Sequence, residues 1–416
     1  MTSERVTAPA AHAHGAPYPG LRPFGADDAV HFFGRDQQVG ELVDLLGRTG
    51  FLAVVGGAGC GKSSLLHAGL LPALHGGLFG AAGQRWRVAS LRPADDPVGG
   101  LARALAALDG FGPAEWDDGL RAVVVETTLR SGSLGLVEVV RQAGTARDEN
   151  LLVVVDQFDD LFRLAPEGQG SGEGAAGFVK LLLEAVRQNE SPVYVALTLR
   201  TDYMGDCAEF SGLPEAINSG HYLVPRLSRD QGREAVTGPA RVRRGGVSPR
   251  LADRVLNDLG NDPDKLPSFQ HALMRTWQAW EADHGEGEPV DLRHYEEAGG
   301  ISGALAKHGE EAYAELPDDR GRELARGVFG ALTEWCAGGR EIRRPLKVKD
   351  ICAKTGAGEA EVTSLVEFFR REGLSFLSPS GPQPLSAESL VEVSYENLIH
   401  DWPRLKGWAG APPPRQ

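Results

Sequence analysis

Residues 51–65 read FLAVVGGAGCGKSSL, and this stretch decides the fold. An apolar run ends at Gly56, a turn of small residues follows, and Gly61, Lys62 and Ser63 open a helical pattern that continues SLLHAGLLPAL. The spacing is G-x-x-x-x-G-K-S between a strand and a helix, which is typical of a phosphate-binding loop. A glycine-rich turn that matches by chance is the alternative, and the flanking strand and helix argue against it.

The residue types of this loop suit a phosphate chain and a divalent cation. Glycines let successive backbone N–H groups point inward, and the helix that begins near Lys62 adds the positive end of its dipole. Lys62 supplies a point charge for the β- and γ-phosphates, and the hydroxyl of Ser63 is an oxygen ligand of the kind that Mg²⁺ prefers. The residues expected to contact the phosphates are Gly56, Gly57, Ala58, Gly59, Cys60, Gly61, Lys62, Ser63 and Ser64.

An acidic partner follows a second apolar run, LLVVVDQFDD at 151–160. Such a run is typical of a parallel strand buried on both faces, whose carboxyl end faces the ligand crevice. Asp156 is therefore predicted to hold the Mg²⁺ through water. Asp159 and Asp160 are predicted to orient the attacking water or to act as a base. The alternative for these two is a solvated helix N-terminus, where acidic residues are favoured in any case.

A third strand pattern, SPVYVALTLR at 191–200, ends in Arg200. A cation at the carboxyl end of a strand next to the phosphate-loop strand can contact the γ-phosphate, and we expect Arg200 to do so. An ordinary surface arginine is the alternative. The catalytic candidates are thus Lys62, Asp156, Asp159, Asp160 and Arg200.

Composition narrows the class of protein. The chain has 416 residues, enough for about two to four domains. No apolar run approaches a membrane span, and residues 1–17 lack the apolar segment of a signal peptide, so we expect a disordered leader and a cytoplasmic protein without a membrane partner. The four cysteines show no metal spacing, which indicates a reducing compartment. A net charge of −14 argues against a nucleic-acid partner.

The order of the periodic patterns predicts an α/β fold with two further domains. Strands and helices alternate over 18–227, which favours a parallel sheet covered by helices, interrupted by a glycine-rich loop at 167–177. Helical patterns alone fill 228–317 and predict a helical lid. Over 318–408, three helices and two short strands, LSFLSP and SLVEVS, describe a winged-helix domain. The end of the chain, 409–416, reads as the start of a linker.

Eight segments, in this order along the chain, resemble the STAND class of P-loop NTPases, and within it the subgroup called novel STAND NTPase 1. The resemblance extends from Pro17 to Trp408. The segments that carry it are PYPGLRPF (17–24), FFGRD (32–36), the phosphate loop with AGLLPAL, LRPADDP (91–97), VVVDQFDDLF, LTLRTDY, DKLPSFQHALMRTW (264–277) and SYENLIHDWPRLKGW (394–408).

The resemblance implies a switch operated by ATP and ADP with Mg²⁺. Relatives hold ADP in a closed form, exchange it for ATP after a trigger, then oligomerise and activate an effector, with slow turnover. By the same resemblance Phe33, Gly34 and Arg35 cover the adenine, and Pro267 packs on the nucleotide. Tyr395 stands where many relatives carry a histidine that reaches the ADP phosphate. It is either a latch on ADP or a tyrosine packed in the winged-helix core.

Two departures from the family pattern bear on function. Asp159 and Asp160 replace two glutamates, and because each is one methylene shorter, a misplacement of about 1 Å can cost on the order of a hundredfold in rate. We therefore expect slow hydrolysis. Relatives also carry sensor repeats and an effector, as in signalling or bacterial defence, which we expect either in a longer chain or encoded separately. We expect a homo-oligomer in the ATP-bound form.

The alternative from a different class is a nucleotide-gated transcription regulator whose winged helix binds DNA. Such a helix should present basic and amide side chains. The candidate, EAEVTSLVEFFRREG, is acidic for most of its length and ends in Arg370 and Arg371. An ABC-type ATPase would need a signature such as LSGGQ, which does not occur, and a P-loop kinase would need an arginine-rich lid.

Overall fold

The computed structural model describes residues 16–77, 85–93, 96–109, 111, 117–143, 149–163, 172–188, 193–260, 262–335, 341–381 and 383–408. These residues fall into two compact units. One comprises 23–232, the α/β unit, and the other comprises 1–22 with 233–416, the helical unit. Most of the predicted leader and the whole of the predicted tail, 409–416, lie outside the described residues.

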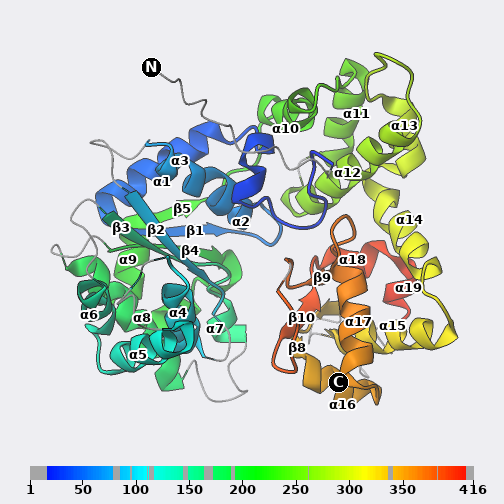
Figure 1. Cartoon of the computed structure of the whole chain (residues 1–416). Helices are drawn as coiled ribbons and strands as arrows, with labels where there is room; N and C mark the ends of the chain where they lie inside the picture. The colour runs from blue at the N-terminus through cyan, green and yellow to red at the C-terminus, as the bar shows by residue number, and fades with distance from the viewer. Residues whose placement is uncertain are drawn as a thin grey trace, which may run out of the picture. The chain divides into compact units, whose positions relative to one another are not determined.

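The α/β unit is built on a five-stranded parallel sheet, as the sequence predicted (Figure 1). Its strand order is β2-β3-β4-β1-β5. The strands span β1 Phe51–Gly56, β2 Arg85–Leu91, β3 Glu149–Val155, β4 Val193–Arg200 and β5 His221–Leu223. Both β1 and β3 are buried along their whole length, which explains why they read as continuous apolar runs. β4 lies between β1 and β3, so it is a neighbour of the phosphate-loop strand, as expected.

Helices cover both faces of this sheet (Figure 1). The helices on one face are α1 (Asp36–Thr49) and a continuous helix made of α2 (Lys62–Ser64), a π-helical segment η2 (Leu65–Leu70) and α3 (Leu71–His75). Those on the other face are α4 (Pro97–Ala106), α5 (Asp118–Arg130), α6 (Gly135–Gln142), α8 (Gly172–Arg187) and α9 (Leu213–Gly220). Because α8 begins at Gly172, the part of the predicted loop 167–177 that is described is helical, which corrects the prediction.

Short helices complete the α/β unit. They are η1 (Ala26–His31), α7 (Asp160–Arg163), η3 (Thr201–Tyr203) and η4 (Asp206–Glu209). Two of them follow β3 and β4: α7 begins at Asp160, five residues after β3 ends, and η3 begins at Thr201, the residue after β4. They therefore turn the chain back at the carboxyl edge of the sheet, where the predicted site residues lie.

The first part of the helical unit consists of helices, as predicted for 228–317. They are α10 (Arg229–Val242, which begins in the α/β unit), α11 (Pro249–Leu259), η5 (Pro263–Lys265), α12 (Leu266–Ala282), α13 (Leu292–Ala298) and α14 (Gly300–Ala314). Ser248 caps α11 by accepting the Leu251 N–H at 3.2 Å, and Pro249 occupies the first turn, where its missing N–H costs nothing.

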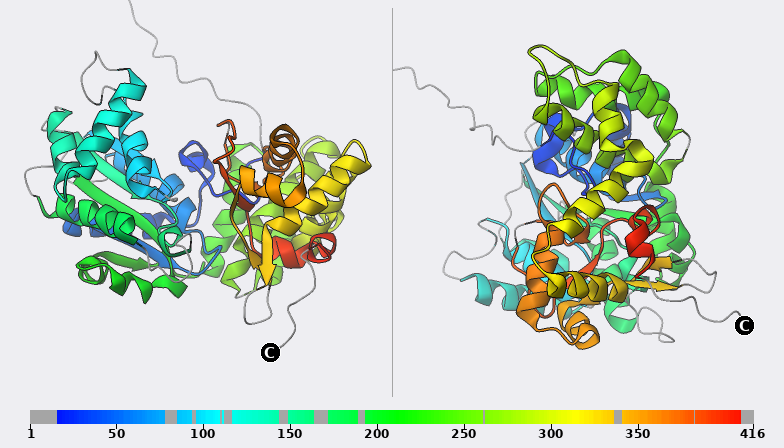
Figure 2. Two further views of the ribbon diagram at one scale, coloured as in Figure 1. Left: turned by 90° about the horizontal axis from the view of Figure 1, so that it is seen from below. Right: turned by 90° about the vertical axis from the view of Figure 1, so that its right-hand side faces the viewer.

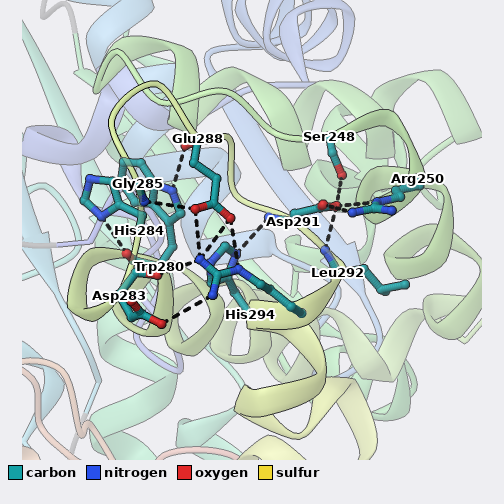
Figure 3. Close-up of polar contacts among 11 residues, drawn as sticks. Ser248, Arg250, Trp280, Asp283, His284, Gly285, Glu288, Asp291, Leu292 and His294 are labelled. Carbon is teal, nitrogen blue, oxygen red and sulfur yellow. Dashed lines mark hydrogen bonds and ion pairs between the residues drawn. The ribbon is translucent and has the colours of Figure 1, made fainter.

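A charged network fixes the starts of α11 and α13 (Figure 3). The carboxylate of Asp291 caps α13 by accepting the Leu292 N–H at 2.8 Å, and it also accepts from Ser248 and from Arg250. These donors, the Arg250 guanidinium first, hold the pKa of Asp291 well below its usual range. In return, the Asp291 N–H donates to Nδ1 of the buried His294 at 3.0 Å. These bonds therefore tie the start of α13 to the start of α11.

The remainder of the helical unit differs in part from the prediction. Its elements are α15 (Asp319–Ala331), β6 (Thr333–Trp335), β7 (Glu341–Arg343), β8 (Leu346–Lys347), α16 (Val348–Thr355), α17 (Glu359–Arg370), β9 (Leu377–Ser378), β10 (Leu390–Val393), α18 (Asn397–Asp401) and α19 (Pro403–Lys406). The two predicted strands form as the antiparallel pair β9-β10, with β8 on the other side of β10.

Strands β6, β7 and β8 were not predicted. The helical pattern RGRELARGVFGALTEWCA extends to residue 337, but the helix ends at Ala331, because Thr333–Trp335 pairs with Glu341–Arg343 as a hairpin. The core of this part is aromatic: Phe329 contacts Phe369 and Trp402 edge-on. In Figure 2, α14 can be followed from the green helices to the orange and red segments of this unit, and it packs on α12 and α18.

Candidate functional site

The register of the sheet brings the predicted site residues to one edge. In the pairing of β1 with β4, Gly56 lies opposite Arg200. In β3, Val155 is paired on one side with Leu91 and on the other with Leu197, and the N–H of Asp156 donates to the Leu91 carbonyl at 2.9 Å. Because parallel strands end at the same edge, the phosphate loop, Asp156 and the end of β4 come together there.

The loop after β1 has the backbone that its glycines permit. Gly59 and Gly61 have φ of 71° and 94°, in the left-handed region that other residues avoid. The Lys62 ammonium donates to the carbonyls of Gly56 and Gly57 at 3.0 and 2.6 Å. Lys62 thus lies over the loop, within reach of anything bound in it. Cys60 is buried against Gly56.

Asp156 is held at the start of the loop helix by a set of short hydrogen bonds. Its Oδ1 accepts from the Ser63 hydroxyl at 2.8 Å and from the Thr198 hydroxyl at 2.6 Å. The Gln157 N–H donates to Asp156 Oδ1 at 3.1 Å and to Thr198 at 2.7 Å, and it does so with a positive φ of 58°. An unusual backbone angle next to a candidate ligand is the kind of strain that functional sites store. The predicted pair of Ser63 and Asp156 is therefore brought into direct contact.

A histidine that the sequence did not single out also contacts this carboxylate. Nε2 of His67 lies 3.5 Å from Oδ2 of Asp156, and both side chains are mostly buried, with exposures of 22% and 18%. Burial raises the pKa of Asp156, but the contacts with His67, Thr198 and Ser63 lower it more, so the net pKa lies below its usual value. Asp156 is therefore a stable anion at neutral pH.

Asp159 and Asp160 are both buried, which excludes the solvated helix end as their explanation. They differ in their partners. Asp160 is paired with Arg92 from the segment after β2 and with Arg163 at 2.9 Å. Asp159 accepts the Arg200 backbone N–H at 3.3 Å. The carboxylate of Asp160 is thus committed to a structural ion pair, and Asp159 is the better candidate for contact with a water.

Arg200 lies at the end of β4, as predicted, but its guanidinium is not an ordinary surface group. It donates to Asp202 at 2.6 Å and lies 5.9 Å from the centroid of the Tyr203 ring. The side chain is 22% exposed, whereas that of Asp202 is 61% exposed. A cation held by an exposed acid can exchange that partner for a phosphate without leaving a buried charge unpaired.

The segment expected to cover the adenine packs on the chain that follows β5. A Cβ on Gly34 would lie 2.4 Å from the Gln231 carbonyl oxygen, and its φ is 83°, so only glycine fits. Arg35 is buried and donates to the Pro225 carbonyl at 2.8 Å, and burial lowers its pKa. Phe33, beside them, is half-buried.

The donor set at this edge fits a magnesium ion. A hydroxyl and a carboxylate oxygen lie 2.8 Å apart on Ser63 and Asp156, and Mg²⁺ prefers few protein oxygen ligands completed by phosphate and water. Across the described residues, no cluster of three or more His, Cys, Asp or Glu side chains could hold a metal, so an all-protein cage is not an alternative there.

A model of the family described as Novel STAND NTPase 1 matches residues 17–412. The chain belongs to this family. This novel STAND NTPase is therefore a nucleotide-dependent P-loop NTPase that binds ATP, and the Ser63–Asp156 pair is where the family's usual Mg²⁺ would be held. No curated protein matches the chain.

The solved structures that match this novel STAND NTPase share little sequence with it. The Walker-type ATPase of Pyrococcus abyssi is 15% identical, with 93% of this chain and 99% of that chain covered and a TM-score of 0.42. The ORC2 protein of Aeropyrum pernix, solved as ADPNP and ADP complexes, is 12% identical, with 90% and 93% covered and a TM-score of 0.44. The RuvB Holliday junction branch migration motor of Thermotoga maritima is 11% identical, with 88% and 95% covered and a TM-score of 0.36.

Two residues that the family resemblance links to the nucleotide belong to the helical unit of this novel STAND NTPase. Pro267 is half-buried in the first turn of α12. Tyr395 is buried in the core around Phe329; its hydroxyl donates to the Asp264 carbonyl and accepts from Asn397 at 2.8 Å. Burial raises the pKa of Tyr395. Its one hydroxyl proton is thus used within the unit, which favours the packing alternative over the latch.

Sequence reasoning missed three residues of this site. Thr198 is a lone polar residue inside the apolar strand β4, and that exception was a usable signal. Arg92 lies in the LRPADDP segment, and nothing local marks its pairing with Asp160. His67 follows Ser63 by four residues, one helical turn, so it shares a face with a predicted ligand.

Over the described part of the chain, no helix is both long and apolar enough to cross a membrane.

Proposed function

We propose that this novel STAND NTPase is an ATP/ADP-operated molecular switch that hydrolyses ATP slowly and controls the assembly and activation of an effector. The observation that supports this best is the convergence at one sheet edge of the phosphate loop, the Ser63–Asp156 pair and Arg200. Nucleotide is held by the loop amides and Lys62. A bound Mg²⁺ would neutralise phosphate charge and orient the β- and γ-phosphates.

Arg200 is proposed as the group that distinguishes ATP from ADP. Its pairing with the exposed Asp202 supports this, because a γ-phosphate can take the place of Asp202 without a desolvation penalty for the acid. A shift of Arg200 would move η3, which begins at the next residue. Recognition of the γ-phosphate by Arg200 would in this way be coupled to a change in the position of η3.

Slow hydrolysis is proposed because, of the two buried acids Asp159 and Asp160, one is held in ion pairs. Asp160 is held by Arg92 and Arg163, which leaves Asp159, and its carboxyl is one methylene shorter than the glutamate of most relatives. Slow turnover suits a switch, because the protein then stays in its ATP-bound or its ADP-bound form long enough for that form to act on an effector. Homo-oligomerisation with ATP, an effector and a sensor, a role in signalling or bacterial defence, and a cytoplasmic location are parts of the same proposal.

The test is the nucleotide that the purified protein retains. On denaturation we expect the protein to release ADP, identified by chromatography, at close to one molecule per chain. We also expect wild-type protein loaded with ATP to hydrolyse it at about one per minute or less, far below the median enzyme rate of about 10 per second. Protein that emerges empty and does not take up ADP would contradict the switch.

The DNA-binding alternative loses support from α17. Arg370 is buried and donates to Glu367 at 2.7 Å and to the Pro379 carbonyl at 3.1 Å, and Arg371 is paired with Glu315. The basic end of the candidate recognition helix is thus occupied by the protein's own acceptors. We expect no salt-sensitive affinity for duplex DNA in an anisotropy titration at physiological salt, and sequence-specific binding there would favour the regulator.

A further inference from the structure

Two side chains on one face of the phosphate-loop helix contact the two oxygens of a single carboxylate. Ser63 donates to Oδ1 of Asp156 at 2.8 Å, and His67, one turn later, places Nε2 3.5 Å from Oδ2. Oδ1 already has three donors: Ser63, Thr198 and the Gln157 N–H. Rotation about the Cβ–Cγ bond moves both oxygens together, so the contact of His67 with Oδ2 adds to the donors on Oδ1 in holding the carboxylate.

The local helix geometry supports a built contact rather than a chance one. His67 lies in the π-helical segment Leu65–Leu70, between α2 and α3. A π-helical turn is wider than an α-helical turn, is rare, and is frequently found at functional sites. On either side of His67, Leu66 and Ala68 are buried, so the imidazole is the polar group that this turn directs at the sheet edge.

We propose that His67 is a positioning residue for the cation side of the nucleotide site: from Oδ2, and together with the donors on Oδ1, it holds the Asp156 carboxylate in the rotation in which it can accept a hydrogen bond from a water on a nucleotide-bound divalent cation. His67 touches neither the phosphates nor the cation. It acts through Asp156, as outer partners of ligating carboxylates do, and such partners typically contribute tenfold or more to metal affinity. The inference rests on the proposed function of the site.

The experiment measures binding of a fluorescent ADP analogue to the full chain as Mg²⁺ is titrated. In His67→Ala we expect affinity in EDTA within about twofold of wild type, and the Mg²⁺ concentration for half-maximal enhancement raised about tenfold. His67→Gln retains an amide donor and should recover most of the shift. His75→Ala is the matched control, because His75 is an exposed histidine two turns further along the same helix.

The outcomes separate this inference from the proposed function. Wild-type protein that binds no ADP analogue would remove both. Normal wild-type binding with the same Mg²⁺ midpoint in His67→Ala would overturn the positioning role alone, and so would an equal loss of affinity in EDTA, since His67 would then support the loop itself. If His67→Ala lowers the melting temperature, His67→Leu, which fills the same space without a donor, must give the tenfold shift or the role is rejected.

Discussion

Asp156 and Tyr395 are each a polar residue placed just after an apolar strand, yet their surroundings differ. Asp156 follows the parallel strand β3. Among the described residues, His67 alone contacts the Oδ2 atom of its carboxylate. Tyr395 follows the antiparallel strand β10, and its hydroxyl is used by the Asp264 carbonyl and Asn397. Neighbouring parallel strands end at the same edge of a sheet, where a ligand crevice forms, whereas neighbouring antiparallel strands end at opposite edges.

The two units also differ in how they bury ionisable groups. In the α/β unit, the buried Asp160 is charged and neutralised by Arg92 and Arg163. In the helical unit, the buried His271 on α12 lies 2.9 Å from His308 on α14, nitrogen to nitrogen, so that one ring donates to the other. A paired charge tolerates a change of pH, but a pair of neutral imidazoles does not.

The largest effect is expected where a buried charge loses its partner. Asp160→Ala leaves two arginines facing an empty carboxylate position, and we expect the α/β unit to lose about 3 kcal/mol of unfolding free energy. Urea unfolding, with hydrogen exchange of β3 and β4 as the local measure, checks this. The matched change Asp159→Asn should cost under about 1 kcal/mol and abolish hydrolysis instead. Equal losses of stability would show that the two aspartates are not distinguished by their partners.

Removing the loop cation should reduce nucleotide affinity almost as strongly. Lys62→Ala removes a charge-assisted contact to phosphate but leaves the glycine backbone intact, so we expect ATP affinity to fall about a hundredfold, which is about 3 kcal/mol. Calorimetric titration measures it. Lys180→Ala, at an exposed position of α8, is the control and should bind as wild type does. Unchanged ATP affinity in Lys62→Ala would remove the phosphate-loop assignment.

The histidine pair should make the helical unit sensitive to acid. Burial lowers the pKa of His308 to about 3, with Arg275 and Arg371 adding to the effect, and burial lowers the pKa of His271 well below 6.5. Between these folded values and 6.5 the unfolded chain binds more protons, so stability falls as the pH falls. From pH 7.5 to 6.0 we expect a loss of about 0.8 kcal/mol per histidine.

Hydrogen exchange of the α12 amides at the two pH values measures this loss. In the double variant His271→Gln, His308→Gln the difference between the two pH values should shrink by about 1.6 kcal/mol. His284→Gln, at an exposed position in the same unit, should retain the wild-type pH dependence. A double variant with an unchanged pH dependence would show that the pair is not the sensitive group.

The smallest effect is expected at Tyr395. Tyr395→Phe removes the hydroxyl bond to Asp264 but keeps the ring in the aromatic core, so we expect a loss of about 1 kcal/mol in the helical unit. Release of a fluorescent ADP analogue, followed by stopped flow, should keep its wild-type rate. ADP release accelerated tenfold or more would instead support the latch, in which Tyr395, like Asp156, acts at the nucleotide site.

Much of the candidate site was predictable because its signals are local. The phosphate loop is contiguous, its glycines are required by backbone angles, and Asp156 directly follows an apolar run that could only be a buried strand. The hairpin of β6 and β7 was missed for the opposite reason. Thr333–Trp335 continues a helical pattern, and pairing with Glu341–Arg343 overrides that local preference.

Local residue patterns were enough to assign the family and the chemistry at the ends of three parallel strands: the nucleotide loop after β1, the acid after β3 and the cation after β4. Which of these polar groups can contact a ligand depends on the fold. In the fold, Asp160 is paired with Arg92, and the Tyr395 hydroxyl donates to the Asp264 carbonyl. Neither partner could be read from the residues next to Asp160 or Tyr395 in the sequence. The physical reason is that availability depends on partners from distant segments, because a buried polar group must find one wherever the fold brings it.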